Sequence, residues 1–338
     1  MRGKGIPMND IKERIREKAL SLGADLIGFS DLTRFRGSNP LQDPTVIFPE
    51  AKSVIGLGFR VLRGSTRGIE EGSVYYQYIT MGIENIEENI MPVTLLRLSS
   101  FIEDMGYDAV PQKMHRNIVA GEDDTHPEIR HDAVYRGIQN EIQLDFKKAA
   151  VACGLGEIGL GGHVLTPEFG PYQRFCFILT NAEIEPDPIP DPTLCDRCGE
   201  CIAACPGKAH EEKVNIEHIA GKEYMMHRID NWQCAVYYKG AARRTNPFMP
   251  PDAFKEHPAR DKIMNGEIKV TPETARQILD QTEFYPGCRH SMVASICGRA
   301  CERACYIHLE KQNRLGRKFH TPFRKRKAWE LKELKGGT

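Results

Sequence analysis

The sequence lacks the features that would direct it to a membrane or to a polyanion. Its 46 basic and 46 acidic residues cancel, so no overall field attracts nucleic acid or anionic lipid. No apolar run approaches the length that crosses a bilayer, and the first ten residues contain neither an apolar signal segment nor a twin-arginine pair. We therefore expect a cytoplasmic protein without a membrane partner, and we do not expect nucleic acid as a partner.

Cysteine, by contrast, is abundant, with eleven in 338 residues. Cytoplasmic thiols stay reduced, so this number indicates metal ligands before disulfides. The segment 194–209, LCDRCGECIAACPGKA, contains four of them, followed by Pro206. The four are Cys195, Cys198, Cys201 and Cys205.

Their spacing, C-x2-C-x2-C-x3-C-P, is that of bacterial ferredoxins. Three such cysteines wrap one iron–sulfur cubane, and the fourth, expected in the following helix, reaches a second cubane. Two cubanes require eight ligands. A zinc site would need only four, and its cysteine pairs are usually further apart.

The other ligands must come from later cysteines. Cys297, Cys301 and Cys305 are four residues apart and would share one face of a helix. Cys234 and Cys288 are isolated. Cys153 and Cys176 have apolar neighbours and are expected in the core.

The first half of the chain alternates helical and extended patterns, which indicates an α/β layer arrangement. We expect helices at 9–22 and 94–105 and strands at 24–29, 53–59, 107–110 and 174–180. The proline-rich segment 182–192 predicts a linker or domain edge. Residues 311–335 contain ten Lys or Arg against two Glu. Such a segment is usually solvated, although an acidic partner or nucleic acid is an alternative.

The order of these motifs resembles epoxyqueuosine reductases and reductive dehalogenases. The ferredoxin run is followed by a lone cysteine in WQCAVYYKG and by the late trio. The passage AAVACGLGEIGLGGHVLTPEFGPYQRFCFILTNAEIEPD, residues 149–187, resembles the segment that precedes the clusters in that superfamily. The opening helix–Gly–Ala–Asp unit and FPEAKSVIGLG (48–58) resemble its N-terminal module.

The resemblance implies a fold of the α/β or α+β class in three parts. A nitroreductase-like, corrinoid-binding domain would cover residues 8–190. A bacterial-ferredoxin-like module with two [4Fe–4S] clusters would cover 191–310, and a basic tail 311–338.

The resemblance also implies how the ligands divide. One cluster would take Cys195, Cys198, Cys201 and Cys305, and the other Cys205, Cys234, Cys297 and Cys301. The late trio departs from the family pattern C-x2-C-x3-C-P, because it runs C-x3-C-x3-C without the proline. Cys288 is an alternative ligand to Cys234.

A corrinoid (cobalamin) would lie against the glycine-rich passage, with Gly154, Gly156, Gly159, Gly161 and His163 as its contacts. Glycines let a backbone approach a large planar ligand, although they serve a tight strand turn equally well. The passage is not a dinucleotide fingerprint, because further glycine and Pro167 follow it where a helix would be needed.

The proton donor is harder to assign. The family uses a tyrosine or an aspartate ahead of the glycine motif, and the aspartate's position corresponds to Asn140, which is no proton donor. The candidates are Tyr135, beside His131 and Arg136, and Asp145. An ordinary tyrosine in a polar loop is the alternative for Tyr135. Tyr75, Tyr76 and Tyr78 are further candidates, or an amphipathic stripe.

The sequence therefore predicts a corrinoid- and iron–sulfur-dependent reductase that resembles dehalogenases and acts on a small organohalide or epoxide. Its electron donor would be a ferredoxin or flavodoxin, and self-association into a homodimer is compatible with the sequence. The alternative is a two-cluster electron-transfer protein without cobalamin. The large N-terminal α/β domain favours the enzyme, because a carrier has no need of it.

Overall fold

The centre of the molecule is a four-stranded antiparallel sheet. The computed structural model describes residues 8–114, 130–135, 138–140, 142–281 and 295–331. The strand order is β1-β2-β8-β3, and neighbouring strands all run antiparallel. The strands are β1 Leu26–Asp31, β2 Ser53–Arg60, β3 Ala109–Gln112 and β8 Gln173–Thr180.

Helices cover both faces of this sheet because successive strand residues point to opposite sides. Ile55 and Leu57 pack in one core cluster with α1 (Met8–Ser21) and α5 (Met91–Glu103). Val54 and Phe177 pack in another with α6 (Phe146–Ala152). The expected helices and strands of this half, and a mixed α and β fold, are confirmed.

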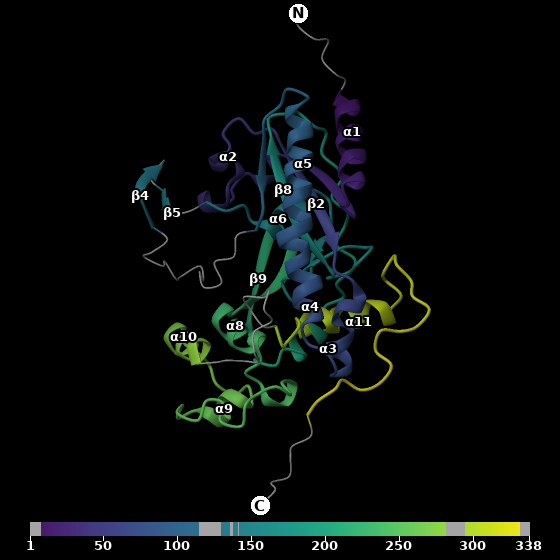
Figure 1. Ribbon diagram of the computed structural model, residues 1–338. Helices are drawn as coiled ribbons and strands as arrows, with labels where there is room; N and C mark the ends of the chain where they lie inside the picture. Colours follow the sequence, from purple (N-terminus) through teal and green to yellow (C-terminus); the bar gives the residue numbers. More distant parts are fainter. Residues whose placement is uncertain (1–7, 115–129, 136–137, 141, 282–294, 332–338) are drawn as a thin grey trace, which may run out of the picture.

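The cysteine-rich half lies at the other end of the molecule (Figure 1). Its helices are α7 Glu200–Ala203, α8 Asn231–Lys239, α9 Arg260–Met264, α10 Pro272–Gln281 and α11 Ala300–Lys311. A hairpin that the sequence patterns did not predict, β9 His210–Ile219 with β10 Lys222–Ile229, connects α7 to α8. None of the described helices has the length and apolar character needed to cross a bilayer.

Shorter elements complete the chain. They are α2 Pro44–Ile47, α3 Arg67–Glu71, α4 Gln77–Ile79, the π-helix Thr80–Ile90, β4 Arg130–Tyr135, β5 Ile138–Asn140, β6 Glu157–Ile158 and β7 Val164–Leu165.

The proline-rich segment 182–192 forms no helix or strand, as predicted, but it is firmly held. Asp187 pairs with Lys12 at 2.7 Å and with Arg16 at 3.2 Å, and Ile184 is buried. This segment is a fixed edge between the two halves.

The stretch after α11 that is rich in Lys and Arg differs from the solvated tail that we expected. Leu315 and Phe323 are buried in the same core cluster as α1, α5 and the residues Tyr306 and Leu309 of α11. The expectation of a wholly solvated segment is therefore wrong, because apolar anchors interrupt the run of charges.

Candidate metal centres and the adjoining cavity

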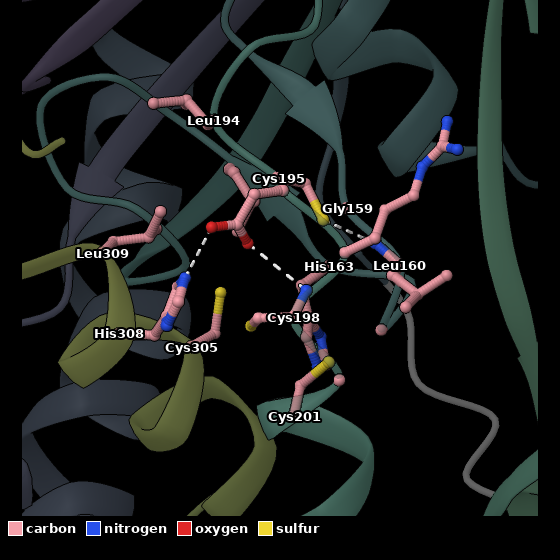
Figure 2. Close-up of a pocket in the computed structure, with 15 residues that line it drawn as sticks. Gly159, Leu160, His163, Leu194, Cys195, Cys198, Cys201, Cys305, His308 and Leu309 are labelled. Carbon is pink, nitrogen blue, oxygen red and sulfur yellow. Dashed lines mark hydrogen bonds and ion pairs between the residues drawn. The ribbon is translucent and has the colours of Figure 1, made fainter. Parts of the chain in front are cut away.

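Four cysteines line a small cavity, which we call the first quartet: Cys195, Cys198, Cys201 and Cys305. The cavity has an empty volume of about 380 Å³. Cys195 and Cys198 lie in the loop before α7, Cys201 lies on α7, and Cys305 lies on α11. Figure 2 shows the side chains of Cys198, Cys201 and Cys305 directed toward a common space.

The thiols of this quartet are close enough to affect each other's ionisation. Burial, and then the neighbouring Cys195 and Cys198, raise the pKa of Cys201 to about 11. Burial and the same neighbours, together with Cys201, raise the pKa of Cys305. Four crowded thiols resist losing their protons unless a cation compensates the charge. Thiolates are the ligands that iron–sulfur clusters need, so this donor set fits one.

Glu157, on β6, positions the loop that carries the first quartet. Its carboxylate accepts hydrogen bonds from the backbone N–H groups of Thr193 (2.6 Å), Leu194 (2.9 Å) and Cys195 (2.7 Å). The side chain is buried, so few other acceptors can replace it. Sequence reasoning did not identify Glu157, although it lies in the GLGEIG passage.

Two glycines of that passage admit the cysteine loop. A Cβ at Gly161 would lie 2.9 Å from Cys201 Sγ, and one at Gly159 would lie 2.9 Å from a methyl carbon of Leu165 and 3.4 Å from Cys195 Sγ. Between them, the Leu160 N–H donates to Cys195 Sγ at 3.2 Å.

The other two glycines approach backbone carbonyls. A Cβ at Gly154 would lie 2.6 Å from the oxygen of Pro188, and one at Gly156 would lie 2.2 Å from that of Leu165. Neither these two nor Gly159 and Gly161 line the large cavity described below. The structure explains these glycines by close packing within the protein, and their contact with a corrinoid remains a prediction.

The remaining predicted ligands form a second quartet, Cys205, Cys234, Cys297 and Cys301, which lines a different cavity. Cys234 lies on α8, and burial and its neighbours Cys297 and Cys205 raise its pKa to about 12. Backbone N–H groups donate to two of these sulfurs, from Ala209 to Cys205 at 3.3 Å and from Ala300 to Cys297 at 3.4 Å. The two quartets are divided as the resemblance implies. That they bind iron remains a prediction.

Two details of the cysteine arrangement differ from expectation. Cys297 precedes α11, and only Cys301 and Cys305 lie on the helix, because Arg299 at its start is left-handed with φ 47°. Cys205 follows α7, which ends at Ala203, and is not inside it. Cys153 and Cys176 are fully buried in the core, as predicted. Cys288 lies outside the described residues.

The second quartet forms part of the wall of a large cavity between the two halves. The enclosed part of this cavity has a volume of about 500 Å³, which lies within the range of about 300–1,000 Å³ usual for small-ligand pockets. The sheet half contributes apolar side chains to the wall, among them Ile79, Met91, Phe146 and Phe175. A partly apolar ligand fits this lining.

Buried charges lie on the same wall. Glu302 pairs with Arg299 at 2.7 Å and with Arg174 at 3.5 Å. Burial alone would raise the pKa of Glu302, but the attraction of its carboxylate to Arg299 and Arg174 has the larger effect and lowers the pKa. Arg174 also donates to the hydroxyl of the buried Tyr78 and lies 3.5 Å from Glu87. The motifs in the sequence did not point to this charged group.

His163 lines both cavities and therefore lies between the two quartets. Burial lowers its pKa to about 3, so the imidazole is neutral near pH 7. Its Nε2 atom is buried and has no hydrogen-bond partner in the described part of the chain. The predicted contact between His163 and a cofactor remains a prediction.

The two predicted proton donors have different outcomes. Asp145 caps α6 by accepting from the backbone N–H groups of Lys147 (3.0 Å) and Lys148 (3.1 Å). It does not line the large cavity, and its assignment as the acid remains a prediction. Tyr135 is the last residue of β4, and its side chain lies outside the described part.

No known family model matches the chain. An epoxyqueuosine reductase from Synechococcus sp. (strain CC9605) is 34% identical over 104 residues, which cover 31% of this chain and 32% of that protein. A tetrachloroethene reductive dehalogenase from Sulfurospirillum multivorans is 39% identical over 66 residues, which cover 19% of this chain and 13% of that protein. The matches thus span a third or less of these relatives.

Solved structures of both enzyme classes are also similar at low identity. A catabolic reductive dehalogenase has a TM-score of 0.49 and 17% identity, covering 82% of this chain and 37% of that one. The epoxyqueuosine reductase of Bacillus subtilis has a TM-score of 0.45 and 17% identity, covering 91% and 84%. Another epoxyqueuosine reductase was solved with a tRNA stem loop, at a TM-score of 0.42, 15% identity and coverage of 90% and 83%. That enzyme binds nucleic acid, whereas the absence of such a partner for this chain remains a prediction.

The relatives with known activities are reductases, and they are the two classes that the cysteine spacing and the glycine-rich passage resemble. Parts of this chain are therefore similar in sequence to epoxyqueuosine reductases and to reductive dehalogenases.

Proposed function

We propose that this chain is a reductase that holds two [4Fe–4S] clusters and a corrinoid and reduces a small electrophile of the organohalide or epoxide type. One observation supports this proposal most strongly. The second quartet and the sheet half share one cavity, so a cofactor seated there would lie directly beside four cysteines. An electron carrier would not need such a cavity.

In this proposal each quartet holds one cluster, and the cavity wall holds the corrinoid. The clusters supply one-electron transfer, and the corrinoid supplies a redox-active cobalt that can reduce an electrophile. The protein contributes the dry apolar wall formed by Phe146, Phe175 and Met91. Such a wall excludes water and strengthens every electrostatic interaction inside it.

The buried charges on the wall can orient a substrate. Arg174 and Arg299 keep Glu302 ionised, and their guanidinium groups are fixed hydrogen-bond donors for a substrate that carries or develops negative charge. The buried Tyr78 retains its proton, because burial raises the pKa of its hydroxyl. Tyr135 remains the proposed proton donor, and Tyr135→Phe should slow turnover without displacing the cofactor.

The test is the metal content of the protein. After anaerobic reconstitution we expect ~8 iron and ~8 sulfide per chain, from two four-cysteine sites. After incubation with hydroxocobalamin and desalting, we expect about one cobalt to remain per chain. A protein that holds both clusters, retains no cobalt and still passes electrons to a partner would instead be the two-cluster carrier.

A pair of variants links cobalt retention to the cavity. Ala235→Trp places a large ring in the cavity wall and should abolish cobalt retention while the iron content stays unchanged. Ala328→Trp, at an exposed position near the end of the described residues, is the matched control and should retain cobalt. Equal retention by both variants would contradict the proposed binding place.

A further inference from the structure

The segment after α11 carries a large surplus of positive charge. Residues 311–329 contain eight Lys or Arg and no Asp or Glu. Five of these eight side chains are exposed and form no ion pair with an acid in the described structure: Lys311, Arg317, Lys318, Lys325 and Lys327. Arg314 is exposed as well and pairs with Asp196 at 3.7 Å. We call residues 311–327 the basic segment.

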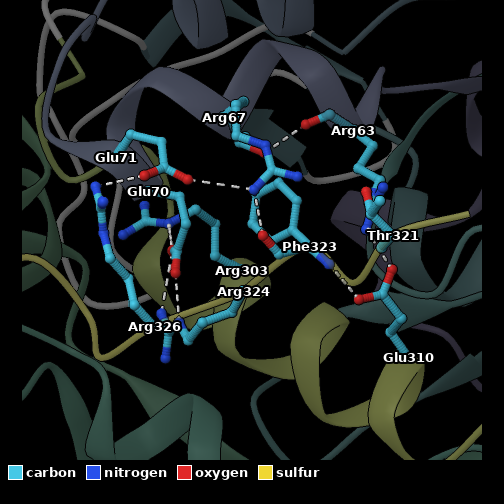
Figure 3. Close-up of polar contacts among 11 residues, drawn as sticks. Arg63, Arg67, Glu70, Glu71, Arg303, Glu310, Thr321, Phe323, Arg324 and Arg326 are labelled. Carbon is cyan, nitrogen blue, oxygen red and sulfur yellow. Dashed lines mark hydrogen bonds and ion pairs between the residues drawn. The ribbon is translucent and has the colours of Figure 1, made fainter. Parts of the chain in front are cut away.

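The basic segment is fixed to the protein, so its charges have defined positions. Figure 3 shows Arg324 on Glu70 and Arg326 on Glu71, with the Phe323 ring beside Arg67. Phe323 itself is fully buried. Arg324 and Arg326 thus neutralise Glu70 and Glu71. A third nearby acid, Glu310, is already paired with Arg63 at 2.7 Å. The remaining cations of the segment are therefore a net positive field.

This segment borders the outer side of the first quartet. Arg314 donates to the backbone carbonyl of Leu194 at 3.0 Å and lies 3.7 Å from the carboxylate of Asp196. Leu194 and Asp196 are the two residues on either side of Cys195. Two residues later, the Gly316 N–H donates to Pro167 O at 2.8 Å. The positive surface thus begins at the loop that carries the first quartet.

The same loop exposes one predicted cluster ligand. Of the eight cysteines in the two quartets, all within the described residues, Cys198 alone is exposed. Arg197, next to it, is exposed as well. A redox centre held there would be closer to solvent than one held by the second quartet. Electrons from another protein therefore have their shortest entry at Cys198.

We propose that the surface around Cys198, bordered by the basic segment, is the docking site of a small acidic electron-donor protein. The inference rests on the proposed function, since it requires a cluster in the first quartet. The donor's reduced centre loses one electron, and the oxidised cluster of the first quartet gains it, with no bond made or broken. Opposite charges on the two partners accelerate such encounters about 10- to 1,000-fold at low salt.

Charge reversal tests this surface. The variant K311E/K318E/K325E reverses three exposed lysines of the basic segment. The matched control, K213E/K255E/K262E, makes the same change in charge at exposed positions on β9 and around α9. Each reconstituted protein is mixed in stopped flow with a reduced acidic flavodoxin and, separately, with photoreduced 5-deazaflavin, a small reductant that needs no docking surface.

We expect reversal in the basic segment to lower the second-order rate with flavodoxin at least ~10-fold at low salt, and the difference to shrink as salt rises. The control variant should stay within about twofold of the native chain, and reduction by deazaflavin should be the same for all three proteins. Equal flavodoxin rates for both variants would overturn the proposal. Binding of a tRNA stem loop that is lost on reversal, while the flavodoxin rate is unchanged, would assign the surface to nucleic acid.

Two further results separate failure of the variant from failure of the proposed reductase. If the reversed variant fails to hold iron, the salt dependence of the flavodoxin rate is measured with the native chain instead. A rate that does not change with salt contradicts an electrostatic docking site. If flavodoxin reduces the iron in a charge-dependent way but no cobalt is retained, the docking surface stands and the proposed reductase fails.

Discussion

The two cysteine quartets have the same ligand chemistry but face different surroundings. The first lines a cavity of about 380 Å³ near the surface and includes the exposed Cys198. The second lies in the wall of the larger cavity that the sheet half helps to form. Under the proposed function, these surroundings would make the first quartet the entry point for electrons and the second quartet the delivery point.

The quartets are nevertheless tied together by the chain. Cys301 and Cys305 belong to different quartets but are separated by about one turn of α11, which is ~5.4 Å of rise. Cys201 and Cys205 are divided in the same way around α7. Clusters bound to both quartets would therefore be close enough to exchange electrons quickly, and their spins should couple in the fully reduced protein.

The largest effect is expected from removing one ligand of each quartet. Cys198→Ala and Cys234→Ala should each lower the iron content from ~8 to ~4 per chain, because each quartet serves one cluster. Only Cys234→Ala should disturb bound cobalt, since only the second quartet lines the large cavity. Iron, sulfide and cobalt analyses check this. Loss of both clusters from either variant would show that the two sites are not independent.

A smaller effect, confined to the first quartet, is expected at Glu157. Glu157→Ala leaves three partly buried backbone N–H groups without their acceptor, at a cost of about 2–4 kcal/mol in unfolding free energy. The first cluster should then be lost before the second. Glu157→Gln keeps one oxygen acceptor and should have an intermediate effect.

Denaturant unfolding and iron release provide the measurements for Glu157. Glu168→Ala, at an exposed position, is the control and should change stability by less than about 0.5 kcal/mol. If Glu157→Ala released iron equally from both sites, Glu157 would not be specific to the first quartet.

The smallest effect concerns the close approach of the glycine passage to the first quartet. Gly161→Ala places a Cβ at 2.9 Å from Cys201 Sγ, so the loop must shift, at about 1–3 kcal/mol. The spectrum of the first cluster should change while that of the second stays the same. Gly64→Ala, where an added Cβ meets no atom within 4 Å, should have no such effect. Unaltered spectra in both variants would contradict the packing role assigned to Gly161.

The sequence predicted the local elements well, and the cysteines lie in the two groups that the resemblance implied, although their role as ligands remains a prediction. Periodic apolar residues determine α1, α5 and the four strands locally, and ferredoxin spacing follows from the geometry of wrapping a cubane. The roles of Glu157 and Arg174 depend on contacts between distant segments, such as Glu157 with Leu194, and no local pattern encodes them. Residue type alone could not decide the role of Asp145, because a helix cap and an acid catalyst use the same residue type.

The burial of two residues of the basic segment could not be predicted from its charge. Its composition is that of a solvated tail, but Phe323 and Leu315 bury themselves among α11 and the sheet half. Two apolar anchors in a run of cations are too few to detect from composition alone. The glycines were ambiguous for a related reason, because a close approach to Cys201 Sγ and a close approach to a cofactor both require glycine.

The central claim is that the second quartet faces the same cavity as the bound corrinoid, while the first faces the surface. The most direct test is the electron paramagnetic resonance signal of Co(II) in the protein loaded with cobalamin, recorded with the clusters oxidised and then reduced. We predict that reducing the clusters broadens the cobalt signal in the native chain and in Cys198→Ala, but not in Cys234→Ala. A cobalt signal that does not change with the oxidation state of the clusters, or whose broadening depends on Cys198 instead of Cys234, would contradict the account.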